Sequence, residues 1–166
     1  MIPAARLRVL YDASLASNPA GTGTYVRGLL SGLRARPEIE VITASFESAS
    51  LATLDTGQKR PLGRVSSSVR HLAYYLRTLP RRARELACDL IYCPSSLVPL
   101  RGTIPYLMTV YDLTPFRYSD TQDWLSRQYI TRMMRAGIGR ASRIVTISRA
   151  VGAELVERFP TVRLRL

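Results

Sequence analysis

The stretch of sequence that decides the fold is RLRVLYDASLASNPAGTGTYVRGLLSGL, residues 6–33. Its apolar run from Leu7 to Tyr11 predicts a buried strand that ends at Asp12. A glycine turn, Gly21-Thr22-Gly23, leads into a helix whose apolar residues recur at helical spacing at Val26, Leu29, Leu30 and Leu33. The start of such a helix offers backbone N–H groups to an anion, although glycine's freedom at positive φ explains the same turn without a ligand.

The rest of the chain continues this alternation of strands and helices. Further strands are predicted over Glu40–Phe46, Asp89–Cys93, Ile104–Tyr111 and Arg143–Ile147. One helix is predicted over Val69–Ala87, with a kink or division at Pro80. Others are predicted over Thr121–Ala141 and after an N-cap at Ser148. Residues 47–68 form a predicted long loop with one short strand around 64–66. The alternation predicts an α/β fold: a Rossmann-like parallel sheet with helices on both faces, in one domain over residues 1–166.

The composition narrows the possible partners and compartment. The formal charge is +12, and Lys59 is the only lysine among the 24 basic residues. Such an excess favours anionic partners, but the arginines are scattered and no recognised nucleic-acid module is present, so we expect no nucleic-acid partner. Arg6 and Arg8 interrupt the first apolar stretch, and no run approaches the roughly 20 residues of a membrane span. We therefore expect a cytoplasmic protein, with Cys88 and Cys93 as reduced core thiols.

Several kinds of active site are missing from the sequence. It has no Walker A motif, no His-Glu-x-x-His and no Asp-x-Asp metal signature, and the spacing of its glycines differs from the dinucleotide fingerprint. The single histidine, His71, falls in a predicted helix away from the strand ends, which indicates a packing or surface residue. We expect no metal ion and no cofactor.

Polar residues instead follow the predicted strands, where ligands of parallel sheets bind. These strand-end residues are Asp12, Ser95, Asp112 and Ser148. Asp112 is suited to accept a proton or hold a substrate hydroxyl, and equally to cap its own turn. Ser148 and Arg149 are suited to bind phosphate, and Ser148 equally to act as a plain N-cap.

Four segments together resemble the family-4 glycosyltransferases of the GT-B type. The segment from Gly21 to Tyr25 resembles their G-x-G-x-Y turn, and Asp89–Pro94 resembles their D-(I/L)-(I/V)-H-x-P strand. PYLMTVYDLTPFRY, residues 105–118, resembles the segment with a strand-end His-Asp pair. RIVTISRAVGAELV, residues 143–156, resembles the strand and helix that follow, and all four occur in the family's order.

The resemblance implies the N-terminal, acceptor-side half of a GT-B enzyme, which works with a C-terminal domain that holds most of the nucleotide-sugar site. It implies that Gly21, Thr22 and Gly23 bind the donor phosphates, and that Tyr111 and Asp112 lie at the catalytic position. The acceptor-binding residues that we expect are Asp12, Tyr25, Ser95, Arg117, Ser148 and Arg149. Tyr111 and Cys93 stand where the family has histidines, and tyrosine does not replace imidazole as a base near neutral pH.

The leading hypothesis is therefore the acceptor-binding domain of a retaining glycosyltransferase, which transfers a sugar from a nucleotide sugar to a glycan or lipid-linked acceptor. We expect this half to be inactive without the C-terminal domain, supplied in the same or a separate chain. The alternative is a non-catalytic domain that binds a sugar phosphate or a partner subunit.

The helix predicted over Val69–Ala87 also suggests a membrane partner. It combines Tyr74, Tyr75 and other apolar residues with several arginines, a composition that allows peripheral binding to an anionic membrane surface. The other interpretation is a helix packed on the core with a solvated basic face.

Overall fold

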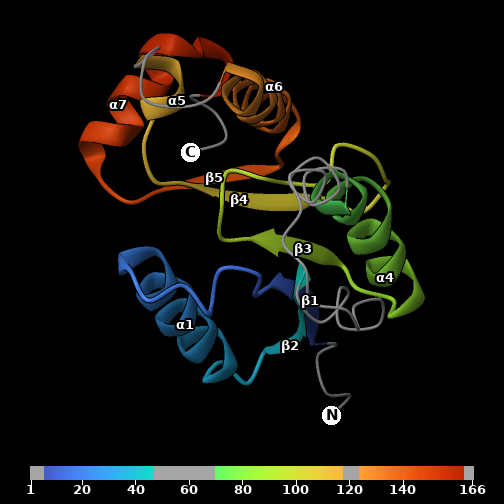
Figure 1. Cartoon of the computed structure of the whole chain (residues 1–166). Coiled ribbons are helices and arrows are strands. Elements are labelled where there is room, and N and C mark those ends of the chain that lie inside the picture. Colours follow the sequence, from blue (N-terminus) through green and yellow to red (C-terminus); the bar gives the residue numbers. More distant parts are fainter. Residues whose placement is uncertain (1–5, 47–69, 118–123, 163–166) are drawn as a thin grey trace.

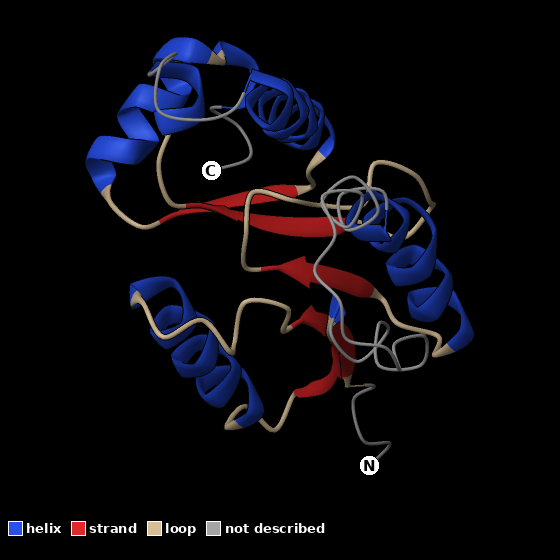
Figure 2. Ribbon diagram, viewed as in Figure 1, coloured by secondary structure: helices blue, strands red, loops and turns tan. Residues whose placement is uncertain are grey.

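Five parallel strands form the sheet of the computed structural model, which describes residues 6–46, 70–117 and 124–162. The strands are β1 (Leu7–Asp12), β2 (Ile39–Ala44), β3 (Leu90–Cys93), β4 (Tyr106–Val110) and β5 (Arg143–Thr146). They lie in the order β2-β1-β3-β4-β5 (Figure 2). This is a doubly wound order in which the direction of winding reverses between β1 and β3, so the predicted Rossmann-like fold is confirmed.

Helices cover both faces of the sheet. Figure 1 shows α1 (Gly21–Arg34) and α4 (Leu79–Glu85) on opposite sides of β1 and β3. The other helical elements are η1 (Tyr74–Thr78), α5 (Thr114–Arg117), α6 (Trp124–Arg140), α7 (Arg149–Arg158) and η2 (Pro160–Val162). No helix within the described segments is both long and apolar enough to cross a membrane.

The two faces carry separate apolar clusters because successive strand residues point to opposite sides of a sheet. Val9 and Tyr11 of β1 pack with Val26 of α1 in the smaller cluster. Leu10, which lies between them in the sequence, belongs to the larger cluster on the other face. Burial on both faces explains why the inner strands β3 and β4 are nearly continuous apolar runs rather than alternating ones.

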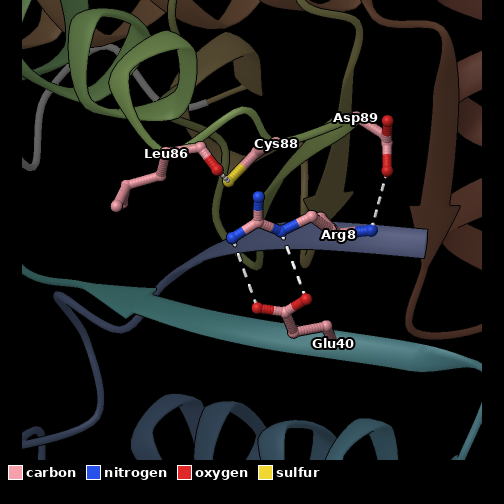
Figure 3. A network of polar contacts seen from close by, with 5 residues as sticks. All are labelled: Arg8, Glu40, Leu86, Cys88 and Asp89. Atoms are coloured by element: carbon pink, nitrogen blue, oxygen red, sulfur yellow. Dashed lines mark hydrogen bonds and ion pairs between the residues drawn. The ribbon is translucent and has the colours of Figure 1, made fainter. Parts of the chain in front are cut away.

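At the amino-terminal ends of the strands, Arg8 bonds to two neighbours, Asp89 and Glu40 (Figure 3). Its backbone N–H donates to Asp89 Oδ2 at 2.8 Å, and its guanidinium Nε lies 3.2 Å from Glu40 Oε2. β1 is thereby linked to β2 on one side and to the start of β3 on the other. The Arg8–Glu40 pair is partly exposed to solvent, so it contributes little to stability beyond fixing the register.

The helical segment between β2 and β3 changes its hydrogen-bonding pattern before Pro80. Residues 70–73 are α-helical, η1 is a π-helical turn, and α4 is α-helical again. Proline lacks an N–H, and its ring clashes with the carbonyl four residues earlier in a regular α-helix, so a wider turn accommodates Pro80. The sequence predicts a kink or division at Pro80, and the structure shows a change from π-helical to α-helical hydrogen bonding just before it, without a break in the helical residues.

The membrane hypothesis for this segment is wrong where it relied on the tyrosines. Tyr74 and Tyr75 are only 3% and 1% exposed, because their hydroxyls donate to the buried carboxylate of Asp12. The exposed residues of the segment are mainly arginines: Arg77, Arg81, Arg82 and Arg84. The segment is a core-packed helix with a basic outer face, as in the second interpretation.

The strands β2, β3, β4 and β5 are each shorter than predicted. β2 ends at Ala44 rather than Phe46, because the Phe46 N–H donates to Ser14 Oγ at 2.8 Å instead of continuing the ladder. The predicted loop over residues 47–68, with its short strand at 64–66, lies outside the described residues.

We predict that Gly137→Ala destabilises the fold. An added Cβ would lie 2.5 Å from Cγ2 of Val98, which is fully buried and stiff at χ1, so the neighbour cannot move aside cheaply. The free energy of unfolding, measured with urea, should fall by about 1–3 kcal/mol.

Gly139→Ala, on the same helix α6, is the matched control. Nothing lies within 4 Å of its added Cβ, so the better helix propensity of alanine should raise stability by up to about 1 kcal/mol. Equal effects of the two substitutions would contradict the packing of α6 described here.

Candidate functional site

The carboxyl-terminal edge of the sheet, at the reversal between β1 and β3, brings several predicted site residues together. Asp12 ends β1, Ser95 follows β3, Asp112 follows β4, and Ser148 follows β5. The start of α1 lies at the same edge because α1 follows β1 after a short loop. Ligands of doubly wound sheets bind at this position.

The three residues of the glycine turn already belong to α1, which begins at Gly21. The N-cap residue, Ala20, has no polar side chain that could accept a hydrogen bond from the first N–H groups. The N–H groups of Gly21 and Thr22 have no partner in the described part of the chain. The Gly23 N–H donates to Ala20 O at 3.0 Å. Two donors at the positive end of a helix are therefore open to an anion.

Gly23 is required by close packing rather than by an unusual backbone angle. A Cβ at this position would lie 1.9 Å from the carbonyl oxygen of Asn18 in the preceding loop. Arg27 holds the same loop, since its guanidinium donates to Ala16 O at 2.6 Å. The loop between β1 and α1 is thus fixed against the helix start.

Tyr25 and Tyr111 join α1 to the end of β4. Their rings meet edge to face with centroids 5.4 Å apart, and Tyr111 Oη donates to Pro94 O at 2.6 Å. Burial is the main cause that raises the pKa of Tyr111 above its usual value, and the neighbouring Tyr25 raises it further. Tyr111 is therefore a neutral hydrogen-bond donor already committed to the end of β3.

Asp112 is exposed at the end of β4. Its Oδ1 accepts the Thr114 N–H at 2.8 Å, which caps the start of α5. This confirms the capping interpretation, and the described residues give Oδ2 no hydrogen-bond partner.

Asp12 is a core residue rather than an open binding group. It is 2% exposed, and its carboxylate accepts hydrogen bonds from Tyr74 Oη at 3.1 Å, Tyr75 Oη at 2.8 Å and Ser14. Burial raises its pKa, against the opposing effect of these hydrogen bonds. The expectation that Asp12 contacts an acceptor does not agree with this geometry, because its oxygens are enclosed.

Two other residues that were expected to bind the acceptor substrate have partners within the protein. Ser95 is 5% exposed, and its hydroxyl donates to Leu97 O at 3.0 Å within a local turn. Arg117 forms a bidentate ion pair with Glu154 of α7, with Nε 2.7 Å from Oε1 and Nη2 2.6 Å from Oε2. Both side chains have partners within the protein, and their contact with an acceptor stays a prediction.

Ser148 and Arg149 begin α7 as predicted. Ser148 Oγ accepts the Val151 N–H at 3.2 Å, so the N-cap is confirmed. Arg149 is exposed on the first turn. Of the two interpretations, the cap is observed, and phosphate binding stays a prediction.

His71 lies nearer to a strand end than the sequence suggested. Its ring meets Phe46, just after β2, and Tyr75, each with centroids 5.1 Å apart. Burial lowers its pKa, while the charge of Asp12 opposes that effect. The prediction of a packing residue agrees with these ring contacts, but the prediction that His71 lies away from every strand end is wrong. Proximity to Asp12 has no local sequence signal, because it arises from the helix crossing behind β1.

The described segments contain no group of three or more His, Cys, Asp or Glu side chains that could hold a metal ion. The open groups at the edge are N–H donors, one carboxylate, hydroxyls and a guanidinium. This set suits the binding of phosphate and sugar hydroxyl groups.

We predict that Asp12→Asn changes how stability depends on pH. The folded state raises the pKa of Asp12 above its ordinary value of 3.8, so between these two pKa values it keeps a proton that the unfolded chain has lost. Stability from this group is complete below pH 3.8 and falls as the pH rises through the window up to the folded pKa. The asparagine variant does not titrate and lacks this contribution.

Urea unfolding of both proteins from acidic to neutral pH tests the prediction. The wild-type free energy of unfolding minus that of Asp12→Asn should decrease as the pH rises. His71, whose lowered pKa makes stability rise with pH, is present in both proteins, and its burial, the larger cause of that shift, is common to both. A constant difference would show that burial does not dominate at Asp12.

The comparison with protein families finds a match that includes the residues at this edge of the sheet. The model of Glycosyltransferase Family 4 matches residues 19–166, which include the start of α1, Tyr111, Asp112 and Ser148. A comparison with curated proteins finds no match. Since the family match covers most of the chain and the fold is that of one GT-B half, the chain belongs to glycosyltransferase family 4.

Proposed function

We propose that this domain supplies the acceptor side of a retaining glycosyltransferase that uses a nucleotide sugar. The observation that carries the proposal is the pair of unpartnered N–H groups at Gly21 and Thr22, at the same sheet edge as the exposed Asp112. Transfer needs an anion site for the leaving diphosphate beside a site for the acceptor hydroxyl, and these groups supply both kinds of contact.

The donor phosphates are assigned to the start of α1. As the sugar leaves, negative charge grows on the diphosphate, and fixed N–H donors stabilise that charge without rearranging. The contact between Gly23 and the Asn18 carbonyl keeps this turn in place before the donor arrives. The nucleotide itself would be held by a C-terminal domain across the cleft.

The acceptor hydroxyl is assigned to Asp112, with Ser148 and Arg149 beside it at the same edge. The free Oδ2 of Asp112 can accept the hydroxyl proton and hold the oxygen toward the sugar. Tyr25 and Tyr111 supply an aromatic wall. Tyr111 is a positioning residue in this scheme, because its hydroxyl is bound to Pro94 O and its raised pKa excludes a role as base. Asp12 takes no part in this scheme.

A donor panel tests the function. The purified chain is assayed for glycosyl transfer and nucleotide-sugar hydrolysis, alone and with a C-terminal GT-B domain. We expect activity only in the mixture. Activity of the chain alone would overturn the need for a second domain, and inactivity in both would overturn the glycosyltransferase proposal.

We predict that Asp112→Asn lowers turnover in the assembled enzyme by about a hundredfold while the fold is kept. Asparagine can still accept the Thr114 N–H, so the cap of α5 survives, but it cannot take up a proton. Asp112→Ala loses both the cap and the carboxylate and should lower activity and thermal stability together. Unchanged turnover in Asp112→Asn would remove the assignment.

One observation favours a second candidate function, a non-catalytic domain that binds a sugar phosphate. Tyr111 replaces the family's histidine, and its hydroxyl is already used within the protein. Saturable binding of a sugar phosphate at Gly21 and Thr22, without transfer in the assembled enzyme, would favour this alternative.

A further inference from the structure

A cavity of about 310 Å³ opens at the edge of the sheet opposite the candidate site. Its wall consists of the loop before β4, the first residue of β4 and the end of α6. The polar residues that line it are Arg101, Thr103, Arg140 and Ser142. Since β4 begins here and the candidate site lies where β4 ends, the two sites are separated by the length of the strand.

The fold holds both sides of this cavity in place. The loop turns at Gly102, whose φ of 121° is open to glycine but strained for other residues. On the other side, Ser142 N–H donates to Tyr106 O at 2.9 Å, and Tyr106 Oη donates to Gly137 O at 3.0 Å. These bonds fix the end of α6, and therefore Arg140, beside the loop.

The charges around the cavity are unbalanced. Arg8, Arg81 and Arg117 each form an ion pair with a glutamate in this structure. Arg101 and Arg140 have no such partner in the described segments, and no carboxylate lines the cavity. The loop also packs on Pro80 of α4, close in sequence to the exposed Arg77 and Arg82.

We propose that this cavity binds a phosphate group through Arg101 and Arg140. Two guanidiniums offer several N–H donors to phosphate oxygens, and the hydroxyls of Thr103 and Ser142 add neutral donors. Their positive charge outweighs the weak negative end of α6, where Arg140 is the last residue. The phosphate belongs either to a soluble phosphate ester or to the headgroup of an anionic lipid. This site is independent of the donor site proposed above.

Amide NMR of the full chain titrated with inorganic phosphate tests the proposal, because it reports each site separately. Saturable shifts are expected at Gly102 and Ser142, apart from any at Gly21 and Thr22. Arg101→Gln and Arg140→Gln should each weaken binding at this cavity about tenfold, the loss expected for one charge-assisted hydrogen bond. Arg34→Gln is the control: Arg34 is exposed at the far end of α1 and should have no effect.

Vesicles separate the two sources of phosphate. Sedimentation with phosphatidylglycerol vesicles, compared with phosphatidylcholine vesicles, is measured for the wild type and the same variants. Binding lost in Arg101→Gln and Arg140→Gln supports a lipid headgroup, and phosphate shifts without vesicle binding support a soluble ester. The proposal is overturned if neither ligand binds at this cavity, or if binding is the same in the wild type and both variants. Circular dichroism confirms that each variant is folded.

Discussion

One buried carboxylate, that of Asp12, organises the carboxyl-terminal edge of the sheet around β1 and β2. Its oxygens accept hydrogen bonds from two tyrosine hydroxyls of η1 and from Ser14, whose own hydroxyl accepts the Phe46 N–H. The ends of β1 and β2 and the helix behind them are therefore held at one point. A carboxylate is costly to bury without such partners, so loss of any one of them leaves that cost uncompensated.

Burial alone separates the roles of the two strand-end aspartates. Asp12 ends β1, where η1 packs over it and supplies two tyrosine hydroxyl donors. Asp112 follows β4 at the surface, where its only described partner is the Thr114 N–H. The same residue type at the same topological position is therefore buried in the core in one case and exposed to solvent in the other.

The excess of arginine has more than one consequence in the fold. Where a glutamate lies close, as for Arg117 and Glu154, arginine joins two elements by an ion pair. Where none does, as at Arg101 and Arg140, its charge remains free for an anionic ligand. With 24 basic and 12 acidic residues, there are too few carboxylates to pair with every arginine. Arginines that are scattered in the sequence therefore leave unpaired positive charge at particular surfaces of the fold.

The sequence by itself determined the five strands, the alternation with helices, an irregularity at Pro80 and the cap at Ser148, because each depends on neighbours a few residues away. Only the tertiary structure decided which polar residues remain available. The hydrogen bond from Tyr75 to Asp12 spans 63 residues, and the ion pair of Arg117 with Glu154 spans 37. No local pattern encodes such contacts, since they arise when crossing helices pack on the sheet.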